Sequence, residues 1–270
     1  MKHTTLLLAF SLLAFVAKAE TSLQERLQLP LYVILSDSDN DINKDLRSVI
    51  DGYWDLNEVE YISEADYEEL SWTAQNCFLV YQKNQSVEDD GTTVYSEVLR
   101  IVAFTKKGKL VENIAGSPIM GYDGENRNTS LVNAVKLLQD KVQFVLYKEQ
   151  GDSEYANYSQ KINSESSIVK LKKLYISAQD LEEGLDYASI RDLYKGEVKI
   201  VDKSYIDKLV EQGSEDAVCV IVNKRQTSGF TYVNTKMIVD ASTGALVYKD
   251  ETTSTSPKGF GKKDFKKLAD

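Results

Sequence analysis

The segment from Leu31 to Ser63 returns, in altered form, between Leu174 and Asp202. Each segment begins with a short apolar run, continues through an acidic turn into apolar residues at helical spacing, and ends in a second apolar run. The two copies lie about 140 residues apart, a period far longer than that of solenoid repeats. We therefore expect a duplicated domain, and this duplication limits the folds that the chain can adopt.

The fold class that we expect is α/β (α+β), with each copy arranged as β-α-β-α-β-β-β-α. Strands joined by helical crossovers run parallel, and a closing hairpin adds antiparallel strands, so each copy should hold a mixed sheet of about five strands with helices packed on it. The expected strands of the first copy are Leu31–Leu35, Val59–Ile62, Cys77–Tyr81, Tyr95–Phe104 and Lys109–Ile114; its expected helices follow Ser36–Asn43 and cover Ala65–Leu70 and Thr129–Glu149.

The second copy repeats this order. Its expected elements are Leu174–Ser177, Ala188–Tyr194, Val198–Val201, Ser204–Val210, Val218–Val222, the hairpin Tyr232–Val239 with Ala245–Asp250, and Lys262–Leu268. In this alignment Cys219 takes the place of Cys77. The predicted boundaries are residues 1–19 for a signal peptide, 20–149 for the first copy, 150–169 for a polar linker and 170–270 for the second copy.

Residues 1–19 have the form of a secretory signal peptide. Lys2 provides a basic start, an apolar run extends from Leu6 to Val16, and Ala17 and Ala19 form an A-x-A cleavage site. The apolar run is shorter than the roughly 20 residues of a membrane-spanning helix. We expect export to the periplasm or the extracellular space, with neither a membrane span nor a lipid anchor.

The composition of the expected mature chain excludes several functions. It carries 42 acidic and 30 basic residues, a net charge of -12, and this charge disfavours nucleic-acid partners. The only histidine is His3, within the signal peptide, which excludes Ser-His-Asp catalysis and His-containing metal sites. No recognisable catalytic motif is present, so we expect a protein that is not an enzyme, although the sequence leaves this open.

Alternating aspartates follow the first strand of the first copy. Asp37, Asp39 and Asp41 have the oxygen chemistry that calcium prefers. The positions that an EF-hand loop gives to Gly and Glu are instead Ile42 and Ser48, and a helix N-cap explains the same residues. We favour the N-cap and keep calcium as the alternative.

The matching turn of the second copy is also acidic and contains Asp180, Glu182 and Glu183. Both turns are expected at the carboxyl ends of first strands, where open α/β sheets bind ligands. These residues are therefore candidates for a ligand or interaction site. Trp54 is a further candidate, because exposed aromatic residues of exported proteins stack on sugars, although packing explains most aromatic residues here.

Three smaller features leave alternatives open. Cys77 and Cys219 are expected as separate buried thiols, since each lies in a central strand, yet an oxidising compartment favours a disulfide. Gly259-Phe260-Gly261 is too short for a phosphate-binding loop. The lysines between Lys258 and Lys267 fit a solvated helix face or a docking segment for the acidic first copy or an anionic partner.

The order of short strand, acidic turn, helix, Tyr53-Trp54, strand Val59–Ile62 and helix Ala65–Leu70 resembles exported bacterial α/β proteins without an assigned activity. It is also similar to small α/β domains of periplasmic envelope proteins, such as the amino-terminal domain of the Tol-system propeller protein and the curli-secretion lipoprotein. The resemblance implies an envelope or secreted location and transfers no site residues.

From the sequence we expect a non-catalytic binding or interaction protein with an unknown protein or cell-envelope partner and no required cofactor. The alternatives are a small-ligand, glycan or calcium-binding protein that uses the acidic turns, and a hydrolase that depends on two carboxylates.

Overall fold

The structure is a computed structural model that describes residues 22–70, 75–87, 93–105, 110–119, 127–227 and 230–269. Within these ranges the chain forms eight α-helices, one 3-10 helix and two five-stranded mixed sheets. None of the helices in these ranges is long and apolar enough to cross a membrane. The expected signal peptide and residues 106–108, between the expected strands Tyr95–Phe104 and Lys109–Ile114, lie outside the described residues.

The first sheet has the strand order β2-β1-β3-β4-β5. Strand β1 runs parallel to β2 and β3, whereas β4 is antiparallel to β3 and β5. The elements of this half are α1 (Leu23–Arg26), β1 (Leu31–Leu35), α2 (Asn40–Tyr53), β2 (Val59–Ser63), α3 (Glu64–Leu70), β3 (Phe78–Val87), β4 (Thr93–Thr105), β5 (Leu110–Ile119) and α4 (Arg127–Gln150).

The second sheet has the order β10-β9-β8-β6-β7, which is the same order when each strand is numbered within its own half. Its elements are α5 (Tyr158–Glu165), η1 (Ser166–Lys170), β6 (Lys173–Ser177), α6 (Tyr187–Leu193), β7 (Val198–Val201), α7 (Lys203–Glu211), β8 (Ala217–Gln226), β9 (Tyr232–Asp240), β10 (Leu246–Ser254) and α8 (Lys262–Ala269). The prediction of a mixed α/β chain with two similar sheets is confirmed.

Local departures from the predicted elements have local causes. Strand β5 continues through Ser117 and Pro118, beyond the expected strand Lys109–Ile114. Proline is tolerated there because β5 is an edge strand. The polar segment 150–169 contains α5 and η1, anchored by the buried side chains of Ile162 and Val169.

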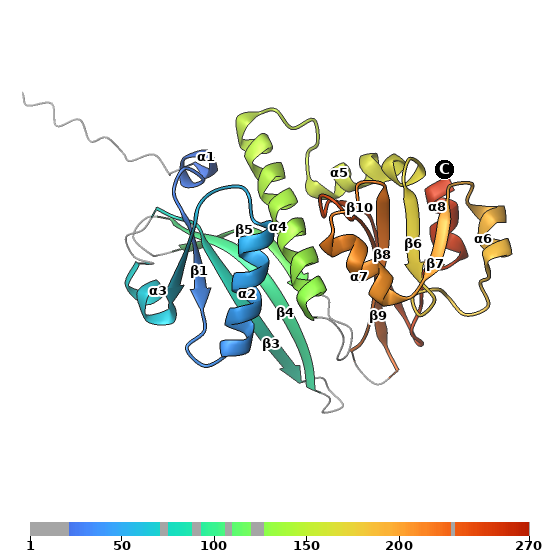
Figure 1. Cartoon of the computed structure of the whole chain (residues 1–270), viewed down its shortest axis with the longest axis horizontal. Coiled ribbons are helices and arrows are strands. Elements are labelled where there is room, and N and C mark those ends of the chain that lie inside the picture. Colours follow the sequence, from blue (N-terminus) through green and yellow to red (C-terminus); the bar gives the residue numbers. More distant parts are fainter. Residues whose placement is uncertain are drawn as a thin grey trace, which may run out of the picture.

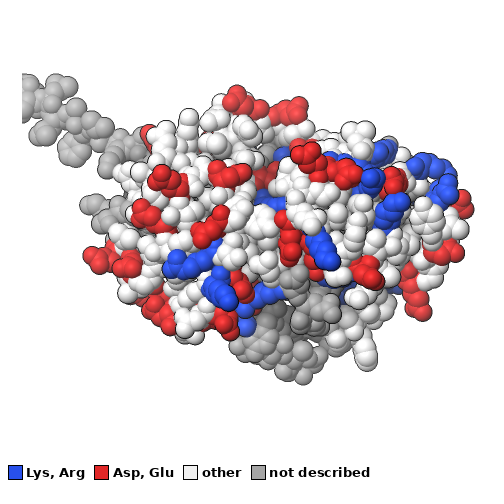
Figure 2. Space-filling model, in the orientation of Figure 1, with Lys and Arg blue, Asp and Glu red and all other residues white. Residues whose placement is uncertain are grey.

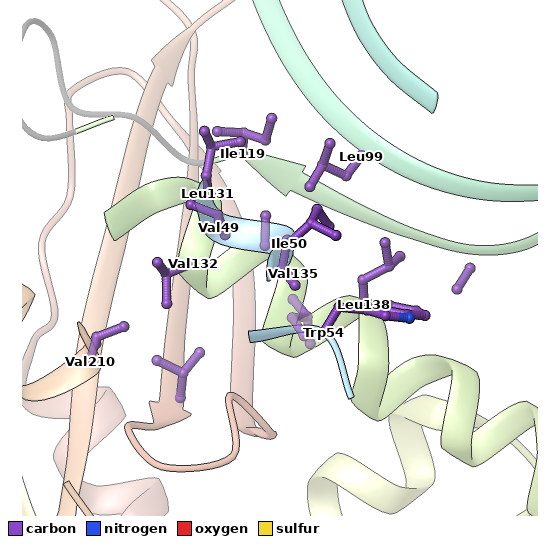
Figure 3. Packing of buried hydrophobic residues seen from close by; sticks show 14 of the residues in the cluster. Val49, Ile50, Trp54, Leu99, Ile119, Leu131, Val132, Val135, Leu138 and Val210 are labelled. Atoms are coloured by element: carbon purple, nitrogen blue, oxygen red, sulfur yellow. The ribbon is translucent and has the colours of Figure 1, made fainter. Parts of the chain in front are cut away.

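Helix α4 lies between the two sheets (Figure 1). On the first sheet it packs against α2, β4 and β5, and on the second half it packs against α7. Its Leu131 and Val135 lie toward Ile50 and Ile119, whereas Val132 lies toward Val210 of α7 (Figure 3). Leu131, Val135, Leu138 and Val142 form one apolar stripe along α4 at helical spacing. Val132 and Leu137 are buried outside this stripe, so α4 contributes to a core that both halves share.

Polar contacts lock α4 to the second half. The buried Lys136 ammonium donates to the carbonyl oxygens of Val210, at 2.8 Å, and of Ala241, at 2.9 Å. Gly244, in the turn between β9 and β10, has φ +71° and approaches α4 so closely that an added Cβ would lie 2.1 Å from Lys136 Cβ. Glycine is therefore required at this turn by its backbone angle and by its contact with α4.

Helix α4 also carries a half-buried lysine, Lys141, on the side of the first sheet. The Lys141 ammonium donates to the carbonyl oxygen of Gly116 in β5. Burial, together with the nearby Lys249 of β10, lowers the pKa of Lys141 to about 8.

Equivalent faces of the two sheets are filled differently. On the α3 face of the first sheet, Phe78 is fully buried by the rings of Tyr32, Tyr67 and Phe104, with centroid distances of 5.6, 5.2 and 5.5 Å. Strand pairing joins Tyr32 to Phe78 and, in the other sheet, Tyr175 to Cys219. When Tyr32 is aligned with Tyr175, the smaller Cys219 stands at the position of Phe78. In the second sheet, this position faces the core shared with α4.

This pairing corrects the alignment of the cysteines. Cys77 corresponds to Val218 rather than to Cys219, so the two cysteines point to opposite faces of their own sheets. A shift of one residue reverses the face of a strand side chain. Both cysteines are buried and no disulfide joins them; burial raises the pKa of the Cys219 thiol to about 12.

We expect Gly244→Ala to destabilise the protein by at least about 2 kcal/mol more than Gly184→Ala, because the added methyl overpacks the contact with α4. Gly184 is the matched control, since it also has a positive φ, +79°, but nothing lies within 4 Å of its added Cβ. Urea denaturation measures both free energies of unfolding. Equal losses would show that the turn does not press against α4.

We expect the stability of the wild type relative to Lys141→Met to rise between about pH 8 and pH 10. In this window the folded state has released the Lys141 proton while the unfolded state still holds it, so raising the pH favours folding by up to about 1.4 kcal/mol per pH unit. Lys148→Met, at an exposed position of the same helix, is the control and should show no such trend in urea denaturation. A constant difference across this range would contradict the burial of Lys141.

Candidate functional site

The strand order creates a switch point at the carboxyl end of β1. The chain leaves β1 through α2 toward β2 on one side, then returns through α3 to β3 on the other side. Helices α2 and α3 therefore lie on opposite faces of the sheet, and the loops at this edge diverge. Open α/β sheets bind ligands at such a point.

A pocket of about 290 Å³ lies at this edge of the first sheet. We call it the first-half pocket. Its walls come from β1 and its following turn, α2, α3 and β3, and the residues that line it are Ile34, Ser36, Ile42, Asn43, Leu46, Glu64, Tyr67, Glu68, Val80 and Tyr81. The lining combines an apolar floor with amide, phenol and carboxylate groups, which suits a ligand with one apolar part and hydrogen-bond donors.

Side chains at the starts of α2 and α3 fix the rim of this pocket. Asp39 caps α2 by accepting from the backbone N–H of Ile42 at 3.0 Å. Asn43 holds the turn after β1, because its side chain accepts from the N–H of Ser36 at 2.9 Å and donates to the Ser36 carbonyl oxygen at 2.7 Å. At α3, the Ser63 hydroxyl and Asp66 carboxylate bond to one another and to each other's backbone N–H, and these bonds lower the pKa of Asp66.

The structure assigns a capping contact to one of the three alternating aspartates. Asp39 is the N-cap of α2, whereas Asp37 and Asp41 flank it at exposed positions. Within the described ranges, no group of three or more His, Cys, Asp or Glu side chains is placed to hold a metal ion. Calcium binding at these aspartates stays a prediction.

The corresponding edge of the second sheet is occupied by the chain itself. Leu181, in the turn after β6, forms a parallel β-bridge with Phe260. The N–H of Phe260 donates to the Asp180 carbonyl oxygen at 2.6 Å, and the N–H of Glu182 donates to the Phe260 carbonyl oxygen at 3.0 Å. We call residues Lys258–Gly261 the C-terminal clip. Asp180 is buried beneath it, while Glu183 stays exposed.

The Gly-Phe-Gly sequence of the clip has a packing role. An added Cβ on Gly259 would lie 2.5 Å from the Leu181 carbonyl group, and one on Gly261 would lie 2.0 Å from a Glu182 oxygen. Phe260 between them is fully buried, with its ring centroid 5.8 Å from that of Tyr248. Because Gly259 meets backbone atoms, it allows the close approach that inserts Phe260 into the core, whereas the Glu182 side chain near Gly261 can move.

Buried polar groups hold both ends of the clip. Asn234 accepts from the N–H of Lys258 at 2.7 Å. Asp264, which is 1% exposed, accepts from the Gly261 N–H, the Lys236 ammonium and the Tyr248 hydroxyl at 2.8, 2.7 and 2.8 Å. Two lysines in or near this segment contact the second half itself: Lys258 lies 3.9 Å from Glu182, and Lys267 lies 2.6 Å from Asp250.

A second pocket, of about 470 Å³, lies between the halves. It is lined by Gly52, Tyr53, Trp54, Asp55, Lys136, Gln139, Asp140, Gln143, Glu211, Gln212, Gly213, Ser242 and Thr243. Several of its polar side chains already bond within the chain. Gln139 donates to the Tyr53 carbonyl oxygen at 2.9 Å and accepts from the Asp55 N–H at 2.7 Å, and the Tyr53 hydroxyl donates to the Glu211 carbonyl oxygen at 2.9 Å. These contacts join α2, α4 and α7.

Trp54 therefore packs at the junction of the halves. It is 8% exposed, and its indole N–H donates to Asn57 at 2.9 Å. The sequence singles out Trp54 and the acidic turns but misses Tyr67, Val80 and Tyr81, which complete the first-half pocket. Their signal in the sequence is ordinary strand or helix burial, and only the strand order brings them beside Ser36.

Comparisons with protein families, with curated proteins and with solved structures find no match to this chain.

We expect Asp39→Ala and Asp186→Ala each to cost about 1 kcal/mol of stability, because each aspartate caps a helix, α2 or α6. The loss should be the same with EDTA and with excess calcium, as measured by urea denaturation. A stabilisation of the wild type by calcium that Asp39→Ala abolishes would instead establish a metal site at the first turn.

Proposed function

We propose that the protein is an exported, non-catalytic binding protein built from two copies of one domain, and that its ligand site is the first-half pocket. One observation carries this proposal. The two halves share a strand order, yet the C-terminal clip covers the turn after β6, whereas the turn after β1 lines an open pocket. Among the residues that the structure describes, none pairs with the turn after β1 as the clip pairs with the turn after β6, and this is the sheet edge where ligands are expected.

Matching details support a duplication. Asp39 and Asp186 cap α2 and α6 in the same way, through the N–H three residues later. The same helices end at buried aromatic residues, Trp54 and Tyr194. The backbone N–H groups of these residues donate to the carbonyl oxygens of Ile50 and Ile190. Shared sheet order and shared caps are more simply explained by a common ancestral domain than by separate origins.

The pocket favours binding over hydrolysis. Glu64 and Glu68 both project from α3, one helical turn apart, and so form one wall of the pocket. Glycoside hydrolysis needs carboxylates on both sides of the bond that is cleaved. A non-enzymatic role also agrees with the absence of histidine from the expected mature chain.

Indole and tryptamine are suitable first probes, because each carries a ring for the apolar floor and a donor for the polar rim. We expect both to perturb the backbone amide signals of Ser36, Asn43 and Glu64 in the NMR spectrum of the full mature chain. Glu64→Trp, at an exposed position of the rim, should weaken binding by about tenfold or more, equivalent to about 1.4 kcal/mol.

The matched control is Glu154→Trp, at an exposed position after α4, and it should leave the affinity unchanged. If neither probe perturbs the rim at millimolar concentration, or if both tryptophan variants weaken binding equally, the pocket is not a binding site.

A further inference from the structure

The negative charge of the chain is concentrated in the first half. Residues 20–149 contain 23 acidic and 12 basic residues, a net charge of -11, whereas residues 150–270 contain 19 and 18, a net charge of -1. The segment from Ser36 to Leu70, which supplies most of the lining of the first-half pocket, contains 12 acidic and two basic residues, and Glu64 and Glu68 among them line the pocket. In Figure 2 acidic side chains are scattered over the α3 side of this face, and a group of basic side chains lies over α2.

The basic residues of this region are Lys44 and Arg47, on α2. The Arg47 guanidinium lies over the Tyr61 ring, 4.2 Å from its centroid, and the Tyr61 hydroxyl donates to Asp51 at 2.6 Å. Two cations do not balance the surrounding carboxylates, so the pocket opens on a surface that attracts cations.

The second half shows what such an edge accommodates. Its occupant, Lys258–Gly261, places one buried aromatic ring, that of Phe260, between glycines and is followed by Lys262 and Lys263. Lys258 lies 3.9 Å from Glu182 of the acidic turn that the clip crosses. The pattern is a single apolar anchor flanked by lysines. The positional counterpart of the clip in the first half, residues 120–126, lies outside the described residues.

We infer that the first-half pocket binds a lysine-rich segment of a partner protein, with one aromatic or large aliphatic side chain in the pocket and ammonium groups on its acidic rim. The inference rests on the proposed function and adds the chemistry of the partner. A volume of about 290 Å³ is at the lower end of the range for small-molecule sites, roughly 300 Å³ upward, and so admits one side chain. Glu64 and Glu68 lie at its wall, within reach of lysines beside that side chain.

The probe is the synthetic peptide acetyl-Lys-Lys-Gly-Phe-Gly-Lys-Lys-amide, titrated against the full mature chain by NMR. We expect saturable binding at 20 mM salt that perturbs Ser36, Asn43 and Glu64, and that weakens several-fold at 150 mM salt, where the screening length is about 8 Å. The peptide with Ser in place of Phe should bind at least about tenfold more weakly, because it lacks the apolar anchor.

Charge-reversed variants of the protein distinguish binding at the first-half pocket from general electrostatic attraction of the peptide to the acidic chain. Glu64→Lys with Glu68→Lys should weaken binding of the Phe peptide at least about tenfold. Asp152→Lys with Glu154→Lys, at exposed positions after α4, changes the net charge by the same amount and should weaken it less than about threefold. If the first pair unfolds the protein, the milder Glu64→Gln is the substitute, and it should still weaken binding measurably.

Three outcomes would overturn the inference: no binding of the Phe peptide at millimolar concentration, equal binding of the Ser peptide, or equal losses from the two charge-reversed variants. If indole and tryptamine bind while the peptide does not, the partner chemistry is wrong and the pocket remains a binding site. If none of the probes binds, both proposals fail.

Discussion

The burial of α4 on two sides is the constraint on which the rest of the structure depends. A helix that packs on one sheet needs one apolar stripe, but α4 contributes to a core that includes residues of both halves. Two of its lysines donate to backbone carbonyl groups. Lys136 donates to carbonyl groups of the second half, and Lys141 donates to one of the first half. Because unpaired buried charges are costly, these contacts fix the position of the helix as well as its burial. The two sheets are therefore parts of one packed unit.

The second sheet has a small side chain in the shared core at a position where the first sheet has an aromatic ring. Cys219 stands where the first sheet has Phe78. The first sheet fills the same face with an aromatic cluster around Phe78, with α3 at its edge. The two sheets thus have similar backbones but cover the equivalent face differently, and the volume of the side chains on that face determines the difference.

The two halves also differ at the sheet edges formed by the turns after β1 and β6. In the second half, the turn after β6 is long enough to pair with the C-terminal clip, and Asp264 and Asn234 hold the clip at both ends. In the first half, Asp39 starts α2 soon after β1, and Asn43 ties the short turn to the helix. The short turn leaves space between α2 and α3, which is the first-half pocket, within the most acidic part of the chain. If the domain was duplicated and the turns after β1 and β6 then diverged, the edge of the second sheet would have acquired a packing role and the edge of the first sheet a binding role.

The sequence by itself determined the order of the elements, the similarity of the halves and the role of Asp39, because strand runs, helix spacing and N-caps depend on residues close together in the chain. Tertiary structure decided that Cys77 and Cys219 face opposite sides, that α4 serves both sheets, that Gly259 admits the C-terminal clip, and that Tyr67 and Val80 meet Ser36. Each of these depends on strand register or on contacts between distant segments, and small changes in register or loop length alter them while the local pattern stays the same.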